Sequence, residues 1–155
     1  MAHGVTTVKT HPPLWLVRWT AERDTTEEII IHARQSPDSA LEMDRWFRRK
    51  GYLQCGFHYC VSRSGVTETR DPSSIGAHLG GHDHRSVGVV ILGWDGKHPD
   101  TLDPATLGHL WDLAAHLRST YPSAEITAAP DFVDSTGGYD PLIELTQDIA
   151  NGISG

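Results

Sequence analysis

Histidines are concentrated in the middle of the sequence. Five of the ten histidines lie between positions 58 and 98, and His78, His82 and His84 follow one another with the spacing H-x3-H-x-H. Neutral imidazole is a common ligand of zinc, so this spacing is compatible with a metal site. The competing interpretation is a loop that these side chains order, or through which they contact a ligand.

A further histidine, His32, follows a run of isoleucines at positions 29–31. Such an apolar run is typical of a strand buried on both faces, and a side chain at a strand end can enter a cleft. No nucleophile elbow joins the serines, histidines and aspartates, and the glycines at positions 76–81 do not match a phosphate-binding loop. Cys55 and Cys60 lack a second pair that could complete a zinc motif, so we expect buried free thiols.

Composition limits the possible partners. The chain has 155 residues, of which 38% are hydrophobic, and its formal net charge is -7. This length suits one domain, and the negative charge argues against binding to nucleic acid, which needs clustered cations. The basic residues at positions 45–50 are typical of a helix C-terminus. No apolar run could span a membrane, and the N-terminus lacks the features of a secretory signal, so we expect a cytoplasmic protein without membrane insertion.

Strand and helix patterns alternate along the chain. Apolar and β-branched runs predict strands at 14–19, 28–33, 57–61, 66–70, 88–93 and 124–127, with a hairpin turn at 64–65. Capping signals and helical spacing predict helices at about 39–50, 103–121 and 141–149. We therefore expect an α/β fold with a single mixed β-sheet flanked by helices. Residues 1–13 are expected to form a flexible arm, and residues 14–151 the domain.

Seven segments of the sequence match the motifs of one family in the right order. They are 29–32, 45–52, 56–59, 63–66, 76–78, 86–89 and 102–105. Together they resemble the zinc-dependent N-acetylmuramoyl-L-alanine amidase family, which includes short phage lysozymes of the amidase type and the peptidoglycan recognition proteins. The resemblance implies the fold of that family and a phage or prophage origin.

The resemblance also implies where a catalytic site should lie. In this family, zinc is held by a histidine that ends the first buried strand, a second histidine on a late strand, and a cysteine or aspartate shortly after it. Zinc-bound water attacks the amide between N-acetylmuramic acid and L-alanine, with help from a tyrosine and often a lysine. His32 stands at the first ligand position. Phe57 stands at the tyrosine position, and loss of such a hydroxyl donor costs roughly 2.7–4 kcal/mol in other enzymes.

The late ligands of the family are missing from this sequence. No histidine or cysteine occurs from position 117 to position 155. The resemblance places Ala128 at the second histidine position, Thr136 at the cysteine or aspartate position and Asp134 near the lysine position. One imidazole should not hold zinc tightly. Loop carboxylates could supply oxygen ligands beside His32 instead, the candidates being Asp131, Asp134 and Asp140.

The histidine-rich loop has a different role in the family, where it helps to wall the substrate groove while zinc is bound by other residues. This favours ligand contact over metal binding for the loop. We therefore expect a ligand-binding set made of His32, Phe57, His78, His82 and Asp83.

Two other features have structural interpretations. His58 lies within the predicted strand at 57–61, and by alternation it should point away from Phe57 and Tyr59, so we expect a buried histidine with satisfied nitrogens. Asp44 and Arg48 have helical i,i+4 spacing, and we expect an exposed pair that contributes little to stability.

These observations predict a catalytically inactive, phage-derived protein of amidase fold that acts by binding, without a metal cofactor. The ligand would be a regulatory protein partner or a peptidoglycan fragment in the former active-site groove. The alternative is an active N-acetylmuramoyl-L-alanine amidase, a peptidoglycan hydrolase with an atypical zinc site built from His32 and the loop aspartates.

Overall fold

The computed structural model describes residues 5–6, 21–129 and 140–153. Within them, six strands form one mixed sheet in the order β1-β4-β3-β5-β2-β6. The strands are β1 (Val5–Thr6), β2 (Glu28–Arg34), β3 (Tyr59–Ser62), β4 (Gly65–Glu68), β5 (Ser86–Leu92) and β6 (Glu125–Ala128). Neighbouring strands are parallel, except β3 and β4, which form the expected antiparallel hairpin.

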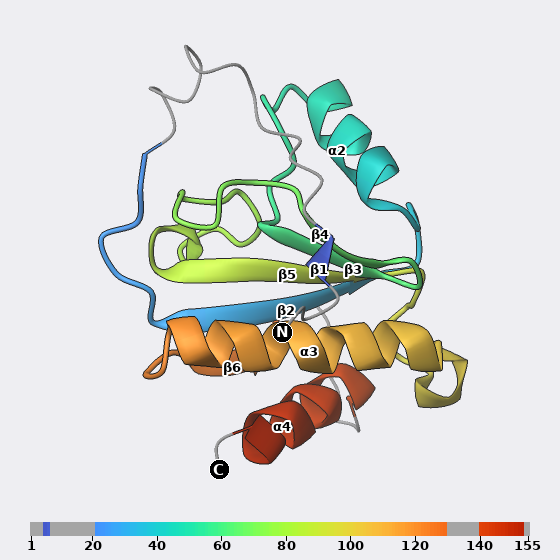
Figure 1. Cartoon of the computed structure of the whole chain (residues 1–155). Coiled ribbons are helices and arrows are strands. Elements are labelled where there is room, and N and C mark those ends of the chain that lie inside the picture. The colour runs from blue at the N-terminus through green and yellow to red at the C-terminus, as the bar shows by residue number, and fades with distance from the viewer. Residues whose placement is uncertain (1–4, 7–20, 130–139, 154–155) are drawn as a thin grey trace.

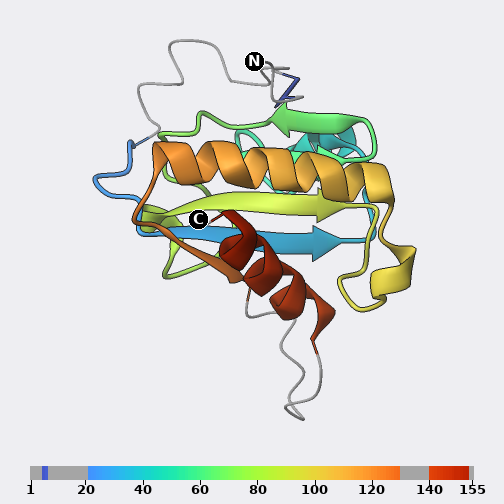
Figure 2. The same ribbon diagram turned by 60° about the horizontal axis from the view of Figure 1, so that its bottom comes forward.

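Helices cover both faces of this sheet, as the sequence predicts. Helix α2 (Ala40–Arg49) lies on one face, whereas α3 (Pro104–Thr120) and α4 (Pro141–Ile153) lie on the other (Figures 1 and 2). Short 3-10 turns occur at Asp83–Arg85 and Pro99–Thr101. None of the helices in the described ranges is long and apolar enough to span a membrane.

Local signals set where two of the helices begin. Ser39 caps α2 and accepts a hydrogen bond from the Glu42 backbone N–H at 3.2 Å. Asp103 caps α3 in the same way, through the Ala105 N–H at 2.8 Å, and Pro104 takes the first helical position. The capping residues predicted from the sequence are thus confirmed for both helices.

Several boundaries differ from the predictions. The strand predicted at 57–61 begins only at Tyr59, because the chain bends through residues 56–58. Two residues of the expected flexible arm, Val5 and Thr6, pair with β4 at the sheet edge, and α4 continues to Ile153, beyond the expected domain end at 151. The strand predicted at 14–19 lies outside the described residues.

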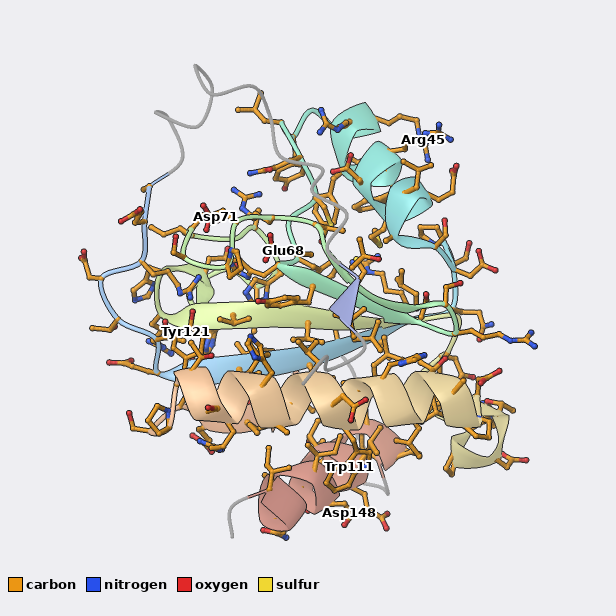
Figure 3. All side chains as sticks on the ribbon, viewed as in Figure 1. Arg45, Glu68, Asp71, Trp111, Tyr121 and Asp148 are labelled. Atoms are coloured by element: carbon orange, nitrogen blue, oxygen red, sulfur yellow. The ribbon has the colours of Figure 1, made fainter. Side chains whose placement is uncertain are left out.

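Alternation along β2 sends its side chains to two different cores. Ile29, Ile31 and Ala33 belong to the large core beneath α3 and α4, so His32 and Arg34 face the α2 side of the sheet. Trp111 of α3 points toward α4 (Figure 3), where a Cβ on Gly152 would come within 2.5 Å of its ring. The smaller core under α2 is where the candidate site is found.

Asp44 corrects one sequence expectation, because it is not part of an exposed ion pair. Its side chain is only 7% exposed, and its two oxygens accept hydrogen bonds from Arg48 Nε at 2.7 Å and from the Cys55 backbone N–H at 2.8 Å. The second bond crosses from α2 to the segment that leads into Phe57. The sequence spacing showed only the first partner, which lies on the same helix.

We expect Asp44→Ala to lower the free energy of unfolding by about 2–3 kcal/mol, because it leaves the buried Cys55 N–H without an acceptor. Glu42→Ala is the matched control on the same helix, since the Glu42–Arg45 pair is exposed, and it should cost less than about 1 kcal/mol. Urea unfolding of both variants measures the difference. Equal losses for the two would contradict the structural role of Asp44.

Candidate functional site

The candidate site lies on the α2 side of the sheet, around His32, Phe57 and His78, which we term the His32 cluster. The parallel register pairs His32 with Val90 of β5. The Phe57 ring lies edge-on to His32, with the ring centroids 4.9 Å apart, and 6.3 Å from His78. His32 is 4% exposed and Phe57 1%. The structure thus brings together three of the five residues predicted to bind a ligand.

A chain of hydrogen bonds fixes the tautomers of the two histidines. Ser86 donates its hydroxyl to the His82 carbonyl at 2.8 Å, so its oxygen accepts from His78 Nε2, 3.1 Å away. His78 Nδ1 is then the acceptor for His32 Nε2–H at 2.9 Å. His32 therefore keeps a lone pair only on Nδ1.

Both imidazoles are held neutral. Burial lowers the pKa of His32 well below its usual range, and the neighbouring His78 and Arg34 lower it further. Burial also lowers the pKa of His78 to about 4, although Asp83 opposes the shift. The 3.6 Å approach of His78 Nε2 to Asp83 Oδ1 is consequently a polar contact rather than an ion pair at neutral pH.

Glycines make room for the His78 ring. A Cβ on Gly88 would lie 2.5 Å from the ring, and a Cβ on Gly76 would lie 2.9 Å from it. Gly56 is equally constrained, because its Cβ would lie 2.2 Å from the Ala77 carbonyl oxygen. These contacts explain why glycines occupy positions 56, 76 and 88 around the His32 cluster.

The other two predicted ligand residues lie at the edge of the site. Asp83 Oδ1 accepts the backbone N–H groups of His78 and Leu79, each at 2.9 Å, and thereby orders the loop. His82 contacts Glu28 Oε1 at 2.9 Å, away from Phe57. Asp83 thus positions His78, and His82 is not part of the His32 cluster.

His58 has the structural role predicted for it, although not by the predicted alternation. Its Nδ1 accepts the Gly88 N–H at 2.9 Å, so Nε2–H donates to the Ser74 carbonyl at 2.7 Å. Both nitrogens are satisfied and the side chain is fully buried. Phe57 and Tyr59 belong to the cores on opposite faces of the sheet, because the strand begins only after His58.

The register of β6 determines which residue stands beside His32. Ala128 pairs with Ile31 and packs with it against the α3 and α4 core, on the sheet face opposite to His32. The next residue, Ala129, donates its N–H to the Ile31 carbonyl at 2.9 Å and is fully buried. By alternation, Ala129 rather than Ala128 faces the His32 side. The second histidine position of the family therefore falls on Ala129, one residue after the Ala128 that the resemblance indicated.

The described donor set does not fit zinc. A zinc hydrolase needs three protein ligands and one open position, whereas the position beside His32 carries only the methyl group of Ala129. Across residues 5–6, 21–129 and 140–153, no group of three or more His, Cys, Asp or Glu side chains could hold a metal ion. Asp140 caps α4 through Oδ1, which accepts the Leu142 N–H at 2.9 Å. Asp131, Asp134 and Thr136 lie outside the described residues.

Arg34 is a feature of the site that sequence reasoning missed. It lies two residues beyond His32 on the same face of β2, and its Cζ is 5.8 Å from the centroid of the Phe57 ring and 5.2 Å from that of Trp46. The signal was available in the sequence, since alternation places residues 32 and 34 on one face. A fixed positive charge here opposes the binding of a cation at His32.

Comparisons with known proteins agree with this architecture. No protein-family model matches the sequence. The endolysin of Escherichia phage T7 is 30% identical over 115 residues, which cover 69% of this chain and 76% of the endolysin. The endolysin of Enterobacteria phage T3 is 31% identical over 117 residues, which cover 70% of this chain and 78% of the endolysin.

Solved structures share the fold at lower identity. The Ph2119 endolysin from a Thermus scotoductus bacteriophage has a TM-score of 0.71 at 19% identity, with 97% of this chain and 100% of that chain covered. The N-acetylmuramoyl-L-alanine amidase LysCS from Clostridium intestinale gives 0.68 at 18%, covering 93% and 95%. A Tyr-to-Phe mutant of Drosophila PGRP-LB in complex with tracheal cytotoxin gives 0.67 at 18%, covering 96% of both chains.

The ordered sequence motifs, the mixed sheet between α2 and the α3–α4 pair, and the identity to the phage T3 endolysin lead to one assignment. The chain belongs to the N-acetylmuramoyl-L-alanine amidase family of phage endolysins and peptidoglycan recognition proteins.

Proposed function

We propose that this protein binds peptidoglycan fragments on the α2 side of its sheet and does not hydrolyse them. The observation that carries the proposal is the pair of positions at the ends of β2 and β6. His32 offers one imidazole lone pair, and beside it Ala129 offers a methyl group. Amide hydrolysis by a member of this family would need a second nitrogen or sulfur ligand at that place.

The residues around His32 also support binding without hydrolysis. Phe57 packs its ring against His32, and it has no hydroxyl to direct at an oxyanion. Arg34 places a positive charge on the same face of β2 and lowers the pKa of His32. The hydrogen bonds from His32 through His78 to Ser86 order a rigid, neutral and buried centre for the proposed binding site.

The fold neighbours support peptidoglycan as the ligand. Several are named peptidoglycan recognition proteins, and one is a Tyr-to-Phe mutant in complex with tracheal cytotoxin. That complex shows that one protein of this fold binds a ligand with a phenylalanine in place of a tyrosine. A regulatory protein partner is the other ligand class that we consider for this chain, and a pull-down from host lysate would test it.

A second candidate function is N-acetylmuramoyl-L-alanine amidase activity. It is favoured by the names of the phage T7 and T3 relatives, both of which are endolysins. Under this alternative, Asp131 or Asp134 would join His32 as oxygen ligands of an atypical zinc site.

Sedimentation with purified peptidoglycan sacculi, together with a turbidity assay and metal analysis, separates the two functions. We expect the protein, purified without chelator, to sediment with sacculi, to leave their turbidity unchanged, and to contain much less than one zinc per chain. The control is His32→Ala, which should alter neither the turbidity nor the zinc content. Clearing of the sacculi, or stoichiometric zinc that His32→Ala removes, would establish the amidase instead.

A further inference from the structure

Arg34 and Lys50 lie against one tryptophan ring beside the His32 cluster. The Arg34 Cζ is 5.2 Å from the centroid of the Trp46 ring, and the Lys50 Nζ is 5.5 Å from the same centroid. Arg34 comes from the end of β2, whereas Lys50 follows the last turn of α2. The end of β2 and the C-terminal end of α2 thus meet at the Trp46 ring, and we term Arg34, Trp46 and Lys50 the Trp46 site.

The cations of the Trp46 site have no carboxylate partner within the described part of the chain. Arg34 is half-buried, yet its guanidinium makes no hydrogen bond or ion pair with any described residue. The arginines on α2 differ, since Arg45 pairs with Glu42 and Arg48 pairs with Asp44, both at 2.7 Å. Arg45 also points away from the sheet (Figure 3).

A half-buried guanidinium without an acceptor favours an anionic ligand. Its N–H donors form a planar fork that matches a carboxylate, and such charge-assisted pairs are stronger than neutral hydrogen bonds. The chain as a whole carries a formal net charge of -7. Two cations on one ring, without an acidic partner among the described residues, are therefore a local exception that attracts anions. Stacking on Trp46 holds Arg34 in place and limits the entropy lost on binding.

Two exposed apolar side chains lie in the segment that follows α2. Tyr52 is 49% exposed, and its ring packs edge-on to Phe47 with the centroids 5.3 Å apart. Leu53, the next residue, is 56% exposed. The Phe47 ring in turn lies 5.1 Å from that of Trp46, so an aromatic row runs from Tyr52 to the Trp46 site, and it suits a short peptide that bears a carboxylate.

We propose that Arg34 anchors the free α-carboxylate of D-glutamate in the peptide stem of peptidoglycan, with Lys50 as a second charge at the same site. This inference rests on the proposed function and specifies which part of the ligand is recognised. The N-acetylated sugars of the glycan are uncharged, whereas the stem peptide carries the carboxylates. The stem is thus the part of the ligand that complements the Trp46 site.

Two muropeptides that differ by one negative charge test whether Arg34 anchors the carboxylate. Isothermal titration calorimetry compares N-acetylmuramyl-L-alanyl-D-glutamate with N-acetylmuramyl-L-alanyl-D-isoglutamine, in which the α-carboxylate is an amide. We expect the unaltered protein to bind the free acid roughly tenfold more tightly or better. Arg34→Gln should abolish this preference and leave the affinity for the amide within about twofold.

Arg49→Gln is the matched control, because it removes the same charge from the end of α2 at a side chain that is not stacked on Trp46. It should keep the preference for the acid. Lys50→Gln changes an exposed side chain and should reduce the preference without disturbing the fold, and circular dichroism of each variant confirms folding.

The outcomes separate this inference from the proposed function. Binding of neither muropeptide, with no sedimentation on sacculi, overturns the proposed function and this inference with it. Equal affinity for the acid and the amide overturns only the role of Arg34. A preference that survives Arg34→Gln, or that Arg49→Gln also abolishes, likewise removes Arg34 as the anchor while peptidoglycan binding stands.

Discussion

Replacing Gly56 with alanine is expected to lower the free energy of unfolding by about 3 kcal/mol. The added Cβ would lie 2.2 Å from the Ala77 carbonyl oxygen and 2.7 Å from Cε1 of Phe47. The backbone at this point has little freedom to yield, because the Ala77 N–H donates to the Gly56 carbonyl at 3.0 Å. Separating the two segments would also displace His78, the residue after Ala77, from His32.

Gly108→Ala is the matched control for this prediction. A Cβ on Gly108, within α3, meets no heavy atom within 4 Å, and alanine is the better helix former by about 1 kcal/mol. We expect this variant to be slightly more stable than the unaltered protein. Urea unfolding at 25 °C measures both changes, and a loss below 1 kcal/mol for Gly56→Ala would show that the two segments can separate without strain.

The fold was largely predictable because its strands and helices carry strong local signals. The isoleucines of β2 mark a buried central strand, and Asp103 followed by Pro104 marks the start of α3. The antiparallel pair β3 and β4 follows from the turn at Ser64–Gly65 between two β-branched runs. Each of these features depends on residues close together in sequence, so pattern and propensity suffice.

The candidate site was less predictable because it depends on contacts between distant segments. Asp44 forms its second hydrogen bond with the backbone of Cys55, across a turn, and no spacing rule indicates that bond. The neighbour of His32 on β6 depends on the sheet register, and a shift of one residue moves a side chain to the other face. The resemblance named His32, Phe57 and His78, whose rings the structure brings together, but it placed Ala128 where the register puts Ala129.

The His32 cluster is uncharged, and the cations near it lie at its edge. Burial keeps His32 and His78 neutral, whereas Arg34 and Lys50 surround the more accessible Trp46 ring. A neutral centre with a cationic border fits the proposed binding of a ligand by its charged end.

Acidification from pH 7 to pH 5 is expected to lower the free energy of unfolding by about 2 kcal/mol through His78 alone. The pKa of His78 is lowered to about 4 in the folded protein, chiefly by burial, whereas an unfolded histidine titrates near pH 6.5. Between these two pKa values His78 binds a proton in the unfolded chain, whereas its ring stays neutral in the folded chain. The stabilisation is thus complete above about pH 6.5 and is lost as the pH falls toward 4.

His78→Asn should be less stable than the unaltered protein at pH 7, because it disrupts the hydrogen bonds to His32 and Ser86. Between pH 7 and pH 5, its free energy of unfolding should fall by about 2 kcal/mol less than that of the unaltered protein. His84→Gln, at an exposed position on the same loop, should retain the full dependence on pH. Urea unfolding at pH 7 and pH 5 gives these differences, and proton NMR follows the His78 ring directly. A His78 signal that titrates near pH 6.5 in the folded protein would mean that water reaches the ring. In that case the cluster could not act as the dry, neutral centre of the proposed binding site.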